Sequence, residues 1–250
     1  MPLLFQPHGN EVFTRLETMA TAEGDHHRNL ASGGARAAVF GMSDGLLTNL
    51  SLILGFAGAH PSGSVVRLAG LAGLIAGACS MASGEWVSVK SQTELLEREL
   101  DVERQALATN PDEERRELQE LYVNKGLSEG LAAQMANEVM ANPKLALEVH
   151  AREELGIDPN ALGSPWLVAG ASFLLFAVGA LLPLIPWLVS GGTAAVWWSI
   201  GLGLAGAAAL GGTVSRMSGK SVVLGAVRQV LITAAAALVT TGIGALVGAG

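Results

Sequence analysis

Residues 37–59 read AAVFGMSDGLLTNLSLILGFAGA, a stretch long enough to cross a bilayer that carries one charge, Asp44. An α-helix needs about 20 consecutive apolar residues to cross the hydrocarbon core. A carboxylate in such a helix costs at least about 3 kcal/mol, so by default it marks an ion or proton path. The stretch therefore predicts a membrane helix in which Asp44 has a function.

Further apolar stretches of similar length occupy residues 65–88, 166–189, 194–214 and 222–247. Only 15% of the 250 residues are charged, whereas soluble domains average about 25%. We therefore predict an all-α membrane protein with five transmembrane helices and the lipid bilayer as its solvent. The single cysteine, Cys79, excludes an intramolecular disulfide.

Between the second and third apolar stretches lies an acidic insert, residues 91–160. It holds 16 of the 22 Asp and Glu residues and 7 of the 15 Lys and Arg residues. Its net charge is therefore −9, against +2 for the rest of the chain. Breaks at Asn110-Pro111, Gly126, Asn142-Pro143 and Gly156 divide it into four helical segments, of which the first continues the second membrane helix without interruption.

Lysine and arginine residues favour the cytosolic side of membrane helices. Their distribution predicts a cytosolic N-terminal arm (1–34), transmembrane helices 1–2 (35–90), a cytosolic helical lobe (91–160) and transmembrane helices 3–5 (161–250). The C-terminus then faces outward. We expect an integral, multi-pass protein of a bacterial inner membrane.

In the first two membrane helices, polar side chains gather around Asp44. Thr48 lies four residues later on the same helix face, and Asn49 adds an amide. Met81 and Glu85 follow in the second helix. A carboxylate with a thioether suits a borderline transition metal such as Fe²⁺ better than Mg²⁺ or Ca²⁺. Alternatively, Met81 fills a helix interface, and Glu85 extends to the membrane surface or marks the entrance of the path.

The acidic insert contains carboxylates and an imidazole at helical spacing. Such groups can converge from several helices to form a metal site. The candidate ligands are Glu99, Glu103, Glu114, Glu117, His150 and Glu154. The alternative is a set of solvated helix faces whose glutamates pair with nearby arginines.

Four motifs make the chain resemble the vacuolar iron transporter family. They are GMSDGLLTN (41–49), SMASGEWVSVKSQ (80–92), EELG (153–156) and PLIP (183–186). The resemblance covers about residues 30–248. It implies a five-span homodimer that exports Fe²⁺ from the cytosol in exchange for protons, with the ions crossing between the first and second spans at the dimer interface.

The resemblance assigns Asp44 and Met81 to the transport path, and Glu103, Glu114, Glu117 and Glu154 to the lobe. The chain departs from the plant-type pattern, as a bacterial-type member would. A lobe glutamate is replaced by Ala106, a methionine pair by His150 and Ala151, and two acidic positions of the membrane path by Ala37 and Gly73.

Three functions remain to be compared. The first is a divalent metal/proton antiporter, with Fe²⁺ favoured, Mn²⁺ second, and Zn²⁺ or Co²⁺ as further cargo. The second is a membrane-anchored metal buffer or sensor, although a mere anchor has no reason to keep Asp44. The third, a di-iron oxidase, is disfavoured because paired Glu-x-x-His motifs are missing, so we expect a transporter rather than an enzyme. We expect no prosthetic group and no nucleic-acid partner.

Overall fold

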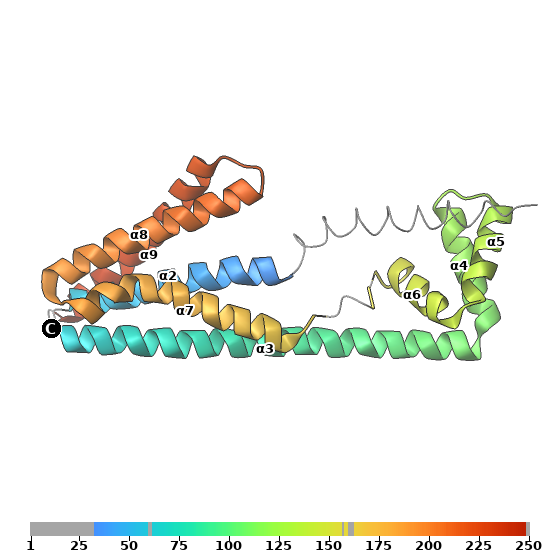
Figure 1. The fold of residues 1–250 in the computed structure, drawn as a ribbon, viewed down its shortest axis with the longest axis horizontal. Coiled ribbons are helices and arrows are strands. Elements are labelled where there is room, and N and C mark those ends of the chain that lie inside the picture. Colours follow the sequence, from blue (N-terminus) through green and yellow to red (C-terminus); the bar gives the residue numbers. More distant parts are fainter. Residues whose placement is uncertain (1–32, 60–61, 157, 160–162, 249–250) are drawn as a thin grey trace, which may run out of the picture. The chain divides into compact units, whose positions relative to one another are not determined.

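The structure is a computed structural model that describes residues 33–59, 62–156, 158–159 and 163–248. The predicted N-terminal arm lies almost entirely outside these residues. The described part is all helical and contains no strand. Its eight helices are α2 (Gly33–Gly58), α3 (Gly63–Thr109), α4 (Pro111–Asn124), α5 (Glu129–Met140), α6 (Pro143–Glu153), α7 (Pro165–Val189), α8 (Gly192–Met217) and α9 (Val222–Gly248) (Figure 1).

Five of these helices, α2, α3, α7, α8 and α9, are long and apolar enough to cross a membrane. The prediction of an all-α chain with five membrane helices is therefore confirmed by length and composition. Helix α3 continues beyond its apolar part as a single helix to Thr109, as expected from the sequence. It stops before Pro111, which opens α4, because the residue before a proline avoids the helical conformation.

The chain divides into two compact units. The membrane unit contains the described residues up to 83 and from 168 onward, and the lobe unit is Gly84–Leu167. In the membrane unit, α8 and α9 pack side by side, and both pack against α2. Buried side chains from α2, α3, α7 and α8 share one core cluster, which includes Ile53, Val66, Leu184, Trp187 and Ala195.

Glycines allow the membrane helices to approach backbone to backbone. Gly45 of α2 faces the carbonyl of Phe176 on α7, and Gly179 of α7 faces the carbonyl of Met42 on α2. Gly244 of α9 lies against the carbonyl of Gly55 on α2 in the same way. Small residues at such crossings are typical of membrane bundles. These glycines therefore serve helix packing.

The lobe unit has a core of its own. Helices α4, α5 and α6 contribute its buried residues, Leu118, Tyr122, Ala132, Ala136, Val139 and Ala146. Helix α6 begins with a capped turn, because the side-chain oxygen of Asn142 accepts hydrogen bonds from the backbone N–H groups of Lys144 and Leu145, at 3.1 and 3.3 Å. Gly126 and Gly156 follow α4 and α6 with positive φ angles of 99° and 66°. The turns predicted at these positions are present.

Candidate metal centre

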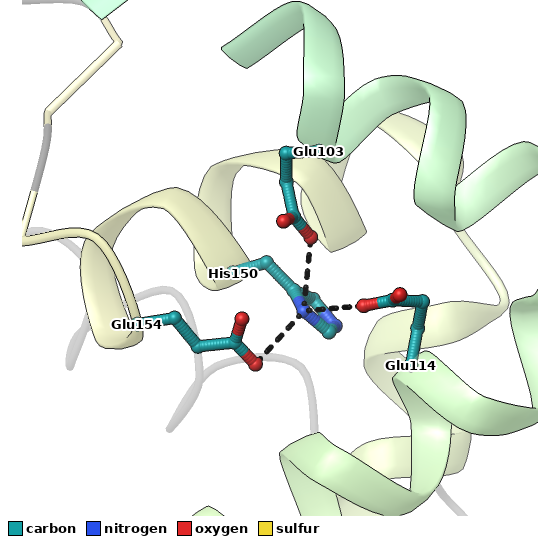
Figure 2. Close-up of side chains that lie close together, drawn as sticks. All are labelled: Glu103, Glu114, His150 and Glu154. Carbon is teal, nitrogen blue, oxygen red and sulfur yellow. Dashed lines mark ion pairs between the residues drawn. The ribbon is translucent and has the colours of Figure 1, made fainter. Parts of the chain in front are cut away.

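Four side chains from three helices of the lobe unit converge on one point. Glu103 comes from α3, Glu114 from α4, and His150 from α6, with Glu154 just beyond the last residue of α6 (Figure 2). One ligand atom from each of the four lies within 4.8 Å of all the others. The capped start of α6 and the break between α3 and α4 set the directions from which these groups arrive.

The imidazole of His150 is at the centre of the cluster. Its Nδ1 atom lies 3.2 Å from an oxygen of Glu103, 3.3 Å from one of Glu154 and 3.7 Å from one of Glu114. Yet among the described residues neither nitrogen of His150 has a hydrogen-bond partner, and neither does Oε1 of Glu103. Buried polar atoms are nearly always satisfied, so a ligand shared by these groups would account for the arrangement.

Three of the four residues of the cluster are buried. His150 is 0% exposed, Glu103 and Glu114 are each 8% exposed, and Glu154 is open to solvent. An isolated carboxylate cannot be buried cheaply, so buried charges are paired or coordinate metals. Glu154 thus lies on the side from which an ion can enter.

Burial and mutual repulsion disfavour the charged form of these carboxylates. Burial, followed by the charges of Glu114, Glu154 and Glu117, raises the pKa of Glu103 to about 7. Burial also raises the pKa of Glu114 and of Glu154, with the charge of Glu117 next in each case. Burial lowers the pKa of His150, although the negative charges of Glu114 and Glu117 act to raise it. A neutral imidazole is the form that binds metals.

The donor set fits a first-row divalent ion. Three carboxylates and one imidazole supply oxygen and nitrogen without sulfur, which suits Fe²⁺, Mn²⁺, Co²⁺ and Zn²⁺. Metal–ligand bonds of about 2.1 Å place ligand atoms up to about 4.2 Å apart. The observed separations, within 4.8 Å, therefore need only a small contraction around an ion.

Three arginines of the described lobe unit pair with acidic residues outside the cluster. Arg104 contacts Asp101, Arg115 lies 3.7 Å from Asp112, and Arg152 binds Glu148 at 2.9 Å. In this part of the chain, no arginine pairs with a glutamate of the cluster. The alternative interpretation, acidic helix faces neutralised by arginine, therefore describes the surface of the lobe unit and not its centre.

Two predicted ligands are not brought into the cluster. Glu117 is exposed and stands outside the group of four, although its charge raises the pKa of Glu103, Glu114 and Glu154. Glu99 is partly buried and is not one of the four either. Glu117 therefore affects the pKa values of the cluster through its negative charge, whereas Glu99 has no described contact with the cluster.

In the membrane unit, Asp44 and Thr48 share one face of α2. The hydroxyl of Thr48 is 3.5 Å from a carboxylate oxygen of Asp44, the outer limit of a hydrogen bond. Met81 of α3 lies against the same end of α2, with its sulfur 3.5 Å from the position that a Cβ on Gly41 would occupy. Gly41 is three residues before Asp44, so Met81 meets α2 about one helical turn away from the carboxylate.

Asn49 and Glu85 lie elsewhere. The amide nitrogen of Asn49 donates to the carbonyl of Ala180 on α7 at 2.6 Å, and Asn49 is 0% exposed. The amide therefore ties α2 to α7. Glu85 is partly buried and belongs to the lobe unit. A further polar link, from the amide nitrogen of Gln229 on α9 to the hydroxyl of Ser43 at 2.8 Å, was not predicted. The lone glutamine in an apolar helix was the available signal.

Five helices long and apolar enough to cross a membrane, and a buried carboxylate–histidine cluster that could hold a metal ion, together indicate a multi-pass membrane protein that handles metal ions. The profile of the VIT family matches residues 35–245. The chain belongs to this family, as the sequence resemblance predicted.

Curated relatives are similar over most of the chain. A vacuolar iron transporter of Acanthamoeba castellanii is 35% identical over 230 residues, 90% of this chain and 83% of the relative. Vacuolar iron transporter 1 of Oryza sativa subsp. japonica is 31% identical over 236 residues, 91% and 92% of the two chains. Vacuolar iron transporter 1 of Tulipa gesneriana is 30% identical over 211 residues, 82% and 84%. Membership of this family indicates metal-ion transport.

Proposed function

We propose that this protein carries divalent metal out of the cytosol in exchange for protons, with Fe²⁺ as the favoured cargo and Mn²⁺ second. The proposal rests on the position of Asp44. It lies within a membrane-length helix next to the hydroxyl of Thr48, and a carboxylate at that depth is retained at a cost. The relatives are named as iron transporters, which supports the choice of metal.

The lobe cluster is proposed to collect the ion on the cytosolic side. Its three carboxylates and the imidazole of His150 offer a borderline donor set. Because metal and protons compete for carboxylates, the same chemistry at Asp44 would couple metal export to proton entry. A gradient that is acid on the far side would then drive the metal outward.

The experiment is metal uptake by the intact chain in proteoliposomes with an imposed pH gradient, comparing Fe²⁺, Mn²⁺, Co²⁺ and Zn²⁺. Uptake should require the gradient, stop when a protonophore collapses it, and be lost in Asp44→Ala. Thr213→Val on α8 is the control, because the hydroxyl of Thr213 is bound to the carbonyl of Ala209. If Asp44→Ala transports metal at the wild-type rate, the proposed path is wrong.

A second candidate function is a membrane-anchored metal buffer or sensor. The observation that favours it is that the lobe unit has its own core and that, among the described residues, all four side chains of the cluster belong to this unit. A buffer would bind metal with wild-type stoichiometry and transport none under any gradient. The uptake experiment therefore separates the two functions.

We also propose that the protein is a homodimer in which α3 faces its partner. The apolar part of α3 is mostly exposed, including Leu68, Leu71 and Ile75, and Cys79 on the same helix is accessible. A bifunctional maleimide should therefore link two copies through Cys79 and leave Cys79→Ser monomeric on a denaturing gel. Absence of the linked species in the wild type would contradict a dimer that pairs through α3.

A further inference from the structure

The face of α2 that carries Asp44 continues as a polar stripe. Thr48 and Ser51 follow at spacings of four and three residues, so all three side chains share one face of the helix. The stripe is not directed at α7 or α8, because Gly45 and the amide nitrogen of Asn49 face α7, while Leu46 and Leu50 meet glycines of α8. Further along the same face, Gly55 and Gly58 pack against α9. The three groups span about 10 Å along the helix axis.

Ser51 differs from most hydroxyl groups of the membrane helices. A serine or threonine in such a helix ordinarily donates to the carbonyl four residues earlier. Ser83, Thr213 and Thr241 do so, at 2.8, 2.8 and 2.7 Å. The hydroxyl oxygen of Ser51 is buried and has no hydrogen-bond partner in the described part of the chain.

Two other membrane hydroxyls, those of Ser172 and Thr233, share this unpartnered state. Both residues are 0% exposed and lie on α7 and α9, whereas Ser51 is only partly buried. Ser51 is thus the unpartnered hydroxyl on the face of α2 that carries Asp44. Thr48 likewise turns toward the side chain of Asp44 rather than toward a backbone carbonyl.

We propose that Ser51 is a further ligand of the transport path, a neutral oxygen that receives the divalent ion after Asp44 and Thr48. This inference rests on the proposed transport function. A moving ion needs successive oxygens that replace its hydration shell but hold it weakly enough to let it leave. A carboxylate followed by two hydroxyls provides oxygens that bind a cation with decreasing strength. The oxygen of Ser51, which has no hydrogen-bond partner among the described residues, has lone pairs free to bind the ion.

The test is uptake by the intact chain in proteoliposomes, with Ser51→Ala, Ser51→Thr and Ser51→Cys. Ser51→Ala should lower the maximal rate roughly tenfold, the effect of one lost hydrogen-bond-strength contact. Ser51→Thr keeps the oxygen and should retain most of the rate. Thr213→Val, which removes a hydroxyl already bound to backbone, should transport like the wild type.

Metal preference provides a readout that a structural role would not change. Ser51→Cys replaces a hard oxygen with soft sulfur, so it should raise the rate for Cd²⁺ relative to Mn²⁺. A variant that merely packs less well would lower both rates by the same factor. Unchanged rates in Ser51→Ala, or an unchanged Cd²⁺/Mn²⁺ ratio in Ser51→Cys, would overturn the proposal.

The outcomes also distinguish this inference from the proposed function. If the wild type transports metal and Asp44→Ala does not, while every Ser51 variant behaves like the wild type, only the role of Ser51 fails. If the wild type transports no metal under any gradient, the proposed function itself fails. Size-exclusion profiles in detergent establish that each variant is folded before its rate is compared.

Discussion

His150 is the residue on which the lobe cluster depends. It contacts all three glutamates of the cluster and supplies the only nitrogen among the four. His150→Ala should therefore weaken binding of Mn²⁺ to the intact chain at least about tenfold, the lower end of what altered metal sites lose. Isothermal calorimetry measures the change, with Glu99→Gln as the control that should bind like the wild type. Equal affinities in His150→Ala and the wild type would contradict the site.

Glu114 and Glu117 provide a sharper comparison, because they lie on one helix and carry the same charge. Glu114 belongs to the cluster, whereas Glu117 acts on it only at a distance. Glu114→Gln should weaken Mn²⁺ binding strongly at any ionic strength. Glu117→Gln should weaken it slightly, and high salt should erase that difference because exposed charges are screened. Loss of binding of the same size in both variants would place Glu117 among the ligands.

Sequence reasoning named the four residues that the structure brings together, whose role as metal ligands stays a prediction, but not which glutamates would stay outside the cluster. Glu103, Glu114, His150 and Glu154 were predicted from helical spacing and resemblance, and the structure brings all four together. Glu99 and Glu117 have the same chemistry and similar spacing. Whether they join depends on the angles at which α3, α4 and α6 meet, and these angles follow from three-dimensional packing and not from helix periodicity.

At the scale of single elements, the start of α6 controls where His150 and Glu154 lie. The side chain of Asn142 caps α6, whereas Ser128 precedes α5 without a side-chain cap. Asn142→Ala should cost about 1 kcal/mol of lobe stability, and Ser128→Ala much less. Hydrogen exchange of the α5 and α6 amides in the intact chain measures both effects. Equal protection in the two variants would mean that the cap contributes nothing.

Helix boundaries were predictable where proline and glycine stand. Helices α3, α4 and α6 end at Thr109, Asn124 and Glu153, one to three residues before Asn110-Pro111, Gly126 and Gly156, where breaks were expected because these residues favour non-helical backbone conformations. The direction in which polar side chains point was not predictable from the sequence. The prediction that Asn49 belongs to the ion path stays a prediction, and the sequence did not indicate that its amide nitrogen would donate to the carbonyl of Ala180 on α7. Adjacent positions on a helix point about 100° apart, so only the packed bundle shows which neighbour each side chain meets.

At the scale of the whole molecule, the cluster makes stability depend on pH and on metal. The pKa of Glu103 rises from 4.5 to about 7 on folding, so between these values the folded chain binds more protons than the unfolded chain. Its stability therefore falls as pH rises through this window. The pKa of His150 is lowered, so His150 has the opposite effect on stability. Below about pH 6.5 the unfolded chain protonates this imidazole more readily than the folded chain, and stability falls as pH falls. The raised pKa values of Glu114 and Glu154 act in the same direction as that of Glu103.

Without divalent cations, the lobe amides of the intact chain should accordingly be less protected from hydrogen exchange at about pH 8 than at about pH 6, after correction for the intrinsic rate. Millimolar Mn²⁺ should restore protection at the higher pH, because the ion replaces the lost protons. Mg²⁺ is the control and should restore less, since it prefers all-oxygen sites. Equal protection at both pH values, with or without Mn²⁺, would show that the carboxyls are not coupled to folding.

The glycines at the helix crossings determine which mutations this gene can accumulate. A single nucleotide change turns a glycine codon into an alanine codon. At Gly45, Gly179 or Gly244 the added methyl group meets the backbone of a neighbouring helix, whereas at Gly170, Gly201 or Gly242 it has nothing within 4 Å. Alanine at the open positions gains about 1 kcal/mol of helix propensity in a soluble helix. A mutational scan should thus sort the membrane glycines into an intolerant set and a tolerant set, and the tolerant set supplies substitutions for a more robust protein.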